Sequence, residues 1–284
     1  MPAFATTPYY RMAAKPLTRD LIDAPDHWRL SLLVNRHSLD VLARALNRDE
    51  VIVASLPYDA SCESQAQALE EVVYANPMLI QPWAAVDVAL VSDRVQILPA
   101  EVAADADAVD AVVDILGLEG IEPLVSPIDG RYSEVVAVDK DVMRFLRRTF
   151  DSARISGHIG ILARYFSRRS RLGNTSKLYV NLRSDSVDVL AFDSLGLASA
   201  TTFDASSDAD AVYYALAVLQ TAGMNRDTDE IMVSGDAERR PAVMAELLKY
   251  AVNVMPTVFP SAMYRGNHDV LSAPFELIIM PLCE

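Results

Sequence analysis

The sequence predicts an α/β protein built from two similar lobes, and three observations carry this prediction. The 284 residues are 51% hydrophobic and 23% charged, which is typical of a folded protein with room for about two domains. The segment Ser38-Leu-Asp-Val-Leu-Ala43 recurs as Ser186-Val-Asp-Val-Leu-Ala191, so that five of six positions are identical at an offset of 148 residues. The hydrophobic pattern around both copies predicts the same order of elements, β-β-β-α.

Both copies of the repeat lie in a predicted hairpin that leads into a third strand and a helix. The strands are predicted at 30–34, 38–43 and 51–56 in the first half and at 177–181, 186–191 and 197–203 in the second. The polar links Asn35-Arg-His37 and Arg183-Ser-Asp185 are typical of hairpin turns. Apolar residues at helical spacing then predict one helix in each half, marked by Ala66, Leu69, Val72 and Val73 and by Val212, Leu216 and Leu219.

Further elements distinguish the two halves. After the second helix, a strand at 230–234 is followed by a turn at Gly235 and by a helix with Pro241 in its first turn. The first half has four more strand candidates, at 86–90, 94–98, 122–128 and 132–138, which predict an inserted subdomain of about 84–138. The apolar run 275–283 is predicted as a terminal strand. The expected domains are an N-terminal tail (1–28), a first lobe (29–172) and a second lobe (173–284).

Composition and missing motifs exclude several classes of function. A net charge of −14 opposes binding to DNA and general nucleic-acid binding. The sequence has neither an apolar stretch long enough for a transmembrane helix nor a signal peptide, so a cytoplasmic protein is expected. The two cysteines lack metal-ligand spacing, and P-loop, dinucleotide, hydrolase and zincin motifs are absent. The four histidines are expected at the surface or in caps, and only His37 lies in a predicted turn.

Two β-β-β-α halves, each opening with a hairpin whose turn faces a central cleft, resemble the actin-like ATPase (ribonuclease H-like) superfamily. That superfamily includes sugar kinases, Hsp70-type chaperones, the cell-division protein FtsA, the pilus protein PilM and secretion-platform relatives. The resemblance spans about residues 29–284 and is greatest to a bacterial domain family of unknown function assigned this fold. It implies a duplicated fold around a cleft that, in active members, binds ATP and Mg²⁺.

The sequence departs from the superfamily at the turns that bind phosphate. Active relatives carry Asp-x-Gly there, since glycine admits the phosphates and the aspartate holds magnesium or orients water. The second turn instead has Asn181-Leu182-Arg183, and the first has neither an acidic residue nor a glycine. The segment Ser234-Gly235-Asp236 resembles the turn near the adenosine, although a glycine at a strand-to-helix turn also serves steric needs. The candidate cofactor-binding residues are Asn35, His37, Asn181, Arg183, Ser184, Ser234, Gly235 and Asp236.

A second candidate site is a concentration of arginines between residues 144 and 171. Eight arginines face a single acid there, so the segment has a charge of about +7 and the rest of the chain about −21. The pattern predicts two helices that could dock an acidic protein, an anionic lipid surface or RNA. The alternative is a pair of solvated helical faces that form ion pairs within the protein. The candidate partner-binding residues are Arg144, Arg147, Arg148, Arg164, Arg168 and Arg169.

Three functional hypotheses follow. The first is a degenerate actin-like protein that is no enzyme and acts as an interaction module or scaffold, with a protein partner or as a homodimer. The second is a nucleotide-gated or weakly active ATPase in which Asp40, Asp185, Asp188 or Asp236 replaces the missing metal ligands. The third is RNA or membrane-surface binding through the arginines, with any membrane contact indirect. The first is preferred, with no catalytic residue, no metal site and no cofactor, and with ATP and Mg²⁺ as the alternative.

Overall fold

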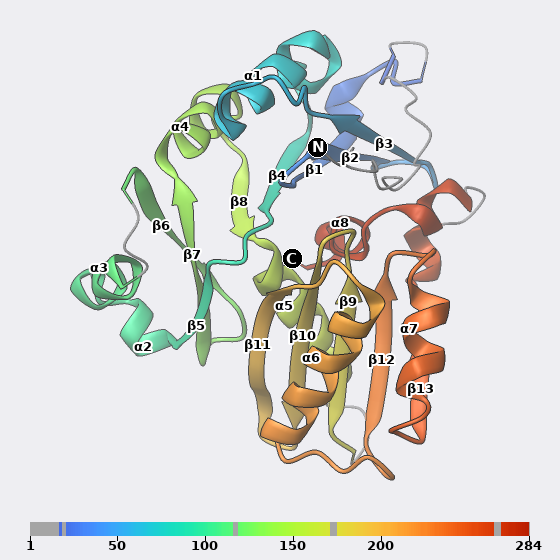
Figure 1. The fold of residues 1–284 in the computed structure, drawn as a ribbon. Helices are drawn as coiled ribbons and strands as arrows, with labels where there is room; N and C mark the ends of the chain where they lie inside the picture. Colours follow the sequence, from blue (N-terminus) through green and yellow to red (C-terminus); the bar gives the residue numbers. More distant parts are fainter. Residues whose placement is uncertain (1–16, 19–20, 116–118, 171–174, 264–267, 284) are drawn as a thin grey trace, which may run out of the picture.

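The computed structural model describes residues 17–18, 21–115, 119–170, 175–263 and 268–283. Two five-stranded sheets form an upper and a lower lobe, and a smaller three-stranded sheet lies beside them (Figure 1). Short 3-10 turns occur at Pro25–His27, Pro77–Ile80, Ser261–Met263, His268–Ser272 and Met280–Leu282. Among the described residues, no helix has the length and apolar character needed to span a membrane.

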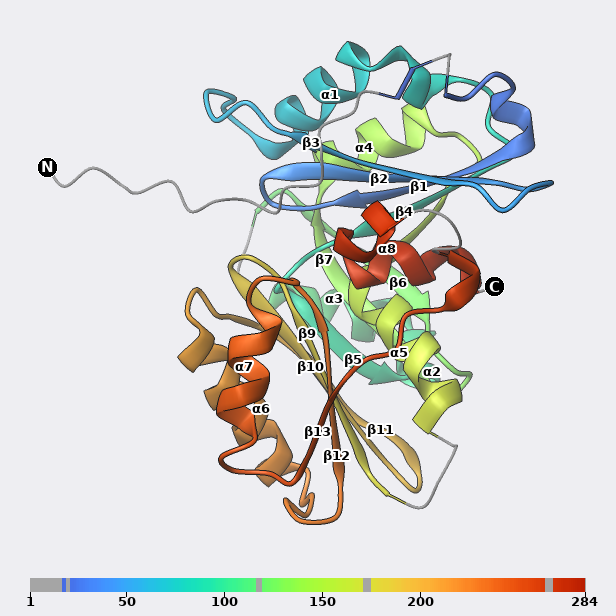
Figure 2. The same cartoon turned by 90° about the vertical axis from the view of Figure 1, so that its right-hand side faces the viewer.

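The first sheet has the strand order β3-β2-β1-β4-β8. Its strands are β1 (Trp28–Val34), β2 (Ser38–Ala45), β3 (Val51–Pro57), β4 (Ala85–Leu90) and β8 (Arg154–Gly157). The first three pair antiparallel, whereas β4 and β8 continue the sheet in parallel. Helices α1 (Gln65–Ala75) and α4 (Lys140–Thr149) contact each other above this sheet (Figure 2). The Ser64 hydroxyl and the Asp139 carboxylate cap these two helices, so each begins where a side chain satisfies free backbone N–H groups.

The second sheet repeats this topology with the order β11-β10-β9-β12-β13. Its strands are β9 (Lys177–Leu182), β10 (Ser186–Asp193), β11 (Gly196–Asp204), β12 (Glu230–Gly235) and β13 (Asn253–Pro256). Helices α6 (Asp208–Thr221) and α7 (Arg240–Leu247) cover one face, and a capping box of Ser207 and Asp210 starts α6. The predicted duplication of β-β-β-α halves is thus confirmed.

The third sheet belongs to the first half of the chain and has the order β5-β7-β6. It comprises β5 (Val95–Pro99), β6 (Ile121–Pro127) and β7 (Tyr132–Asp139), accompanied by α2 (Ala100–Ala103) and α3 (Ala106–Asp114). Its strands match three of the four extra strands predicted from sequence. The fourth, β4, pairs with β1 in the first sheet, so the separate sheet begins at β5. The domain limits given above otherwise stay predictions.

Two buried helices fill the space between the large sheets, as both views show (Figures 1 and 2). Helix α5 (His158–Ser170) contacts β10 and β11 of the lower sheet and β4 and β8 of the upper one, and α8 (Phe275–Ile279) packs on α5, β1 and β2. Phe166 of α5 stacks on Tyr179 of β9 at 3.7 Å and on Phe275 of α8 at 5.6 Å, measured between ring centroids. These rings join the two lobes through one hydrophobic core.

The prediction of a terminal strand at 275–283 is wrong. Residues 275–279 form α8, and 280–282 form a 3-10 turn. Every residue of α8 is buried, including Glu276, and one polar position in five residues is too little to reveal a helical period. The other four residues are apolar, which agrees with the place of α8 between the lobes.

Candidate functional site

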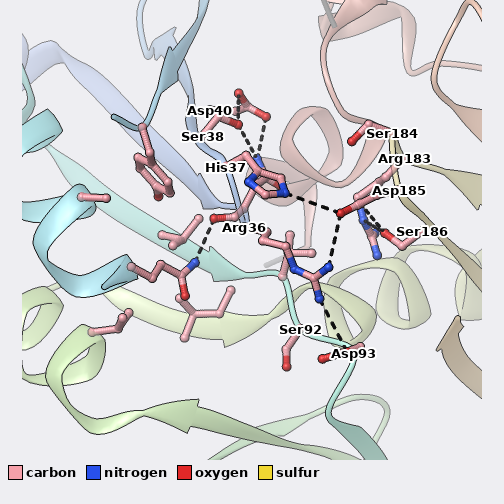
Figure 3. Close-up of a pocket in the computed structure, with 18 of the residues that line it drawn as sticks. Arg36, His37, Ser38, Asp40, Ser92, Asp93, Arg183, Ser184, Asp185 and Ser186 are labelled. Carbon is pink, nitrogen blue, oxygen red and sulfur yellow. Dashed lines mark hydrogen bonds and ion pairs between the residues drawn. The ribbon is translucent and has the colours of Figure 1, made fainter. Parts of the chain in front are cut away.

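The two hairpin turns meet at a cavity of about 1070 Å³ between the lobes. Figure 3 shows residues 36–38 of the first turn and 183–186 of the second around this space. The turns are built alike. In the first, the backbone N–H of Asn35 donates to the Ser38 carbonyl, and in the second the backbone N–H of Arg183 donates to the Ser186 carbonyl, both at 2.9 Å. The repeat seen in the sequence therefore places two equivalent turns opposite each other.

Ion pairs connect the first turn to the second across this cavity. The Arg36 guanidinium lies 3.6 Å from an Asp185 carboxylate oxygen and 3.8 Å from one of Asp93 (Figure 3). His37 Nε2 lies 3.9 Å from the same Asp185 carboxylate. The Arg36 side chain is 60% exposed, so water screens these pairs and each contributes little to stability.

The second hairpin has a buried charged cluster behind its turn. The Arg183 guanidinium donates to Asp188 Oδ1 at 2.8 Å, and its other terminal nitrogen lies 3.5 Å from Glu276 of α8. His158 Nε2, at the start of α5, lies 3.0 Å from Asp188 Oδ1. Burial disfavours the charged form of Asp188, but Arg183 and His158 outweigh that penalty and hold the pKa of its carboxyl well below the usual range.

Asn181 ties this cluster to the neighbouring strand. Its side-chain amide donates to Asp188 and to Glu276, both at 3.0 Å, and its carbonyl oxygen accepts from the Ser234 hydroxyl at 3.0 Å. Asn181 and Ser234 are fully buried. Both the NH₂ group and the carbonyl oxygen of the Asn181 side chain are thus hydrogen-bonded within the protein.

The first hairpin carries an equivalent aspartate in a different environment. Asp40 accepts hydrogen bonds from the side chains of Asn35 (2.7 Å), Ser38 (3.3 Å) and Ser55. None of these donors is charged. Burial raises the pKa of Asp40 to about 6; the hydrogen bonds oppose this rise, and the nearby Glu276 carboxylate adds to it.

The turn after β12 is explained by backbone packing. Gly235 has φ of +86°, and a Cβ atom there would lie 2.0 Å from the Leu182 carbonyl oxygen. The Asp236 amide donates to that same carbonyl at 2.9 Å, while its carboxylate accepts from the backbone amides of Glu238 and Arg239. Only glycine combines this φ with such a close approach, so steric need by itself explains the glycine at position 235.

Comparison with known proteins identifies the family. The model of the family described as "Protein of unknown function (DUF3822)" matches residues 22–254. The chain belongs to this family. No curated protein matches it.

Solved structures show the fold of this DUF3822 chain. A Bacteroides thetaiotaomicron protein described as having an actin-like ATPase fold and unknown function is 22% identical, with a TM-score of 0.76 over 89% of this chain and 97% of its own. A chain of the PilM-PilN type IV pilus biogenesis complex is 11% identical, with a TM-score of 0.52 over 90% of this chain and 97% of its own. The DUF3822 chain therefore has the actin-like ATPase fold, as its sequence predicts.

The structure divides the eight predicted cofactor-binding residues of the DUF3822 chain into two groups. Asn35, His37, Arg183 and Ser184 line the cavity, whereas Asn181, Ser234, Gly235 and Asp236 do not. The four aspartates proposed as substitute metal ligands belong to no cluster of three or more potential ligands in the described ranges. Which of these residues binds a ligand stays a prediction.

Sequence reasoning missed several residues of this site, among them His158, Thr202 and Glu276. The expectation that His158 is a surface or capping residue is wrong, since it is fully buried and bridges the Leu90 carbonyl oxygen and Asp188. Thr202 donates to Asp188 at 2.8 Å from the adjacent strand. Only Thr202 could have been found from the sequence, through the repeat. Thr202 lies opposite Asp188 on the neighbouring strand, just as Ser55 lies opposite Asp40.

The six predicted partner-binding arginines do not form one surface in the DUF3822 chain. Three lie on α4 above the first sheet and three on the central helix α5 (Figure 1). Arg147 pairs with Glu122 at 2.7 Å and Arg148 with Glu70 at 3.1 Å, while Arg144 pairs with Asp141. Arg164 donates to the Pro127 carbonyl at 2.7 Å, Arg169 lies over the Tyr165 ring, and Arg168 also has an interaction within the protein. A partner role for these residues stays a prediction.

Proposed function

We propose that this protein is a non-catalytic member of the actin-like ATPase fold that acts by binding other molecules. The observation that carries the proposal is the Arg183 side chain, which lies where active relatives have glycine and pairs with Asp188 and Glu276 of its own chain. In active relatives a glycine in that place lets backbone amides approach a phosphate, and an arginine lacks the small size and conformational freedom of glycine.

The electrostatics of the cavity also oppose Mg-ATP. Magnesium needs free carboxylate oxygens, and those of Asp188 are taken up by Arg183, His158, Asn181 and Thr202. Seven carboxylate side chains line the cavity against three arginines, so a polyphosphate would meet a net negative charge. Both features favour the absence of ATP hydrolysis.

The likeness to a chain of a PilM-PilN complex supports a protein partner for this fold. A homodimer is the other arrangement that we consider, and a cytoplasmic setting fits both. Light scattering of the purified protein between about 1 and 100 μM distinguishes a monomer from a dimer of micromolar affinity.

The test of the proposal is nucleotide binding and turnover. The thermal midpoint of the purified protein is measured with and without millimolar Mg-ATP and Mg-ADP, since any ligand of the folded state raises it. We expect no shift and no release of phosphate above that of a blank. Release of phosphate above the blank that is abolished by a bulky substitution at the cavity wall, such as Ser184→Arg, with intact unliganded stability, would establish ATP hydrolysis and overturn the proposal.

The arginines of α4 give a second candidate function. Lys140, Arg144 and Arg147 line a small pocket of about 240 Å³ together with Glu122. An anionic partner would have to displace Glu122 from Arg147. If RNA or an anionic vesicle binds here, affinity falls steeply with salt and is lost in Arg144→Gln/Arg147→Gln.

A further inference from the structure

The cavity between the lobes has the dimensions of a small-molecule site. Its volume of about 1070 Å³ is at the upper end of the range of organic ligand pockets. Apolar side chains form a large part of its wall, among them Leu90, Val91, Val138 and Val142. Both lobes contribute to it, so a ligand there would contact the two hairpin turns at once (Figure 3).

The polar groups on this wall select for positive charge. Arg183 is committed to Asp188 and Glu276, while Arg36 is shared between Asp93 and Asp185. The carboxylate of Asp204, which is exposed and also lines the cavity, has no hydrogen bond or ion pair within the described residues. The acids of the cavity therefore exceed the cations available to pair with them.

Two buried groups on the same wall lack the partner that an ammonium group would supply. Asp40 is 6% exposed, and among the described residues its hydrogen bonds come from an amide and two hydroxyls, although Glu276 disfavours its charged form. The Tyr58 hydroxyl is buried without a hydrogen-bond partner in the described part of the chain. Asp40 lies close enough to this phenol to contribute to the rise in its pKa. A carboxyl without a counter-charge and an unpaired hydroxyl oxygen on the same wall are both acceptors for N–H donors.

We propose that the interlobe cavity binds a linear aliphatic polyamine, with one ammonium group at Asp40 and Tyr58 and another at Asp204. The methylene segments of such a molecule fit the apolar wall, and its charges match the excess of acids. This proposal shares with the proposed function the excess of acids in the cavity, but its test measures polyamine binding and not ATP turnover.

The test uses isothermal titration of the full chain with spermidine at fixed ionic strength and pH 7. We expect saturable binding and a raised thermal midpoint, with no effect of the uncharged 1,8-octanediol. The double variant Asp40→Asn/Asp204→Asn should weaken affinity at least tenfold relative to Asp110→Asn. Asp110 lies exposed on α3 away from the cavity, so this variant controls for loose attraction of polyamines to an acidic protein.

A second measurement does not depend on the fold of the double variant. Ammonium binding beside Asp40 favours its ionised form, so titrations at pH 6 in buffers of different ionisation enthalpy should show proton release. Absence of saturable binding up to about 10 mM spermidine overturns the proposal. A loss of affinity below tenfold in the folded double variant, or binding at pH 6 without proton release, also overturns it. Hydrolysis of Mg-ATP would refute the non-catalytic proposal, whereas the spermidine titrations test the polyamine proposal separately.

Discussion

The two hairpins of this protein have the same backbone and different chemistry. Asp40 and Asp188 occupy equivalent positions, each facing a turn residue (Asn35 or Arg183) and a hydroxyl on the third strand. In the first hairpin the partners are neutral, whereas in the second they include Arg183 and His158.

This difference shows that register fixes where a carboxyl lies and that neighbouring charges fix its state. The pKa of Asp40 rises to about 6, while that of Asp188 is held well below its usual range. Duplication thus yields one carboxyl that can change protonation near neutral pH and one that stays ionised.

The largest effect should come from Arg183→Ala. It leaves Asp188 and Glu276 buried without their guanidinium partner, which costs about 4 kcal/mol of unfolding free energy. The repeat-equivalent change Asn35→Ala removes one hydrogen bond to Asp40 and should cost about 1 kcal/mol. Urea denaturation at pH 7 measures both. Equal losses of unfolding free energy in the two variants would mean that the two hairpins are energetically alike.

The next largest loss of unfolding free energy, about 3 kcal/mol, is expected for Gly235→Ala, because the new methyl group would clash with the Leu182 backbone. Gly223→Ala is the matched control, since Gly223 also has a positive φ (+67°) but open space around its Cβ position. Its cost should be about 1 kcal/mol from backbone conformation alone. The first lobe has Leu90 at the strand position that corresponds to Gly235, so the close approach is particular to the second lobe. Thermal unfolding of both variants checks this, and equal midpoints would contradict it.

The pH dependence of Asp40 comes third. Its pKa is about 6 in the folded protein, against 3.8 for an unperturbed aspartate, so the folded protein holds an extra proton between these values. Stability from Asp40 is therefore fully present below about pH 4 and is lost as pH rises through 6, by up to about 3 kcal/mol. The difference in unfolding free energy between wild type and Asp40→Asn should accordingly be larger at pH 4.5 than at pH 7.5.

Asp188→Asn serves as the control for this pH series. The lowered pKa of Asp188 gives stability that is present above pH 4 and lost only on further acidification. The difference in unfolding free energy between wild type and Asp188→Asn should therefore stay constant between pH 4.5 and 7.5. A flat profile for Asp40→Asn as well would show that the two carboxyls titrate alike.

The smallest effect is expected for Arg36→Ala, in the first turn. Its pairs with Asp93 and Asp185 are long and exposed, so the loss should stay below about 1 kcal/mol. This contrasts with Arg183→Ala, the same substitution in the opposite turn. A loss similar to that of Arg183→Ala, measured by urea denaturation, would show that the exposed ion pairs hold the lobes together.

The sequence predicted what depends on local pattern. The repeat located both hairpins with their turns at 35–37 and 183–185, because apolar runs end at polar links. Val212, Leu216 and Leu219 at helical spacing likewise located α6.

The sequence could not predict contacts between distant segments. Glu276 looked like an interruption in an apolar strand, yet it is a buried partner of Arg183 that lies 93 residues away in the chain. His158 had no neighbour in sequence that suggested Asp188. Such pairs exist only after the lobes dock, and no local periodicity encodes them.

Helix α8 also bears on how the protein is made. It follows every strand of both sheets in the chain, yet it fills the space between them and carries Glu276. At ribosomal rates of about 5–20 residues per second, Glu276 is synthesised roughly 5–20 s after Arg183. Helix α5 is synthesised before the second sheet and covers part of both inner faces, but the surface of β1 and β2 that α8 packs on stays uncovered until α8 leaves the ribosome. Docking of the lobes is therefore a late event in biosynthesis, and the nascent chain is a substrate for chaperones during that interval.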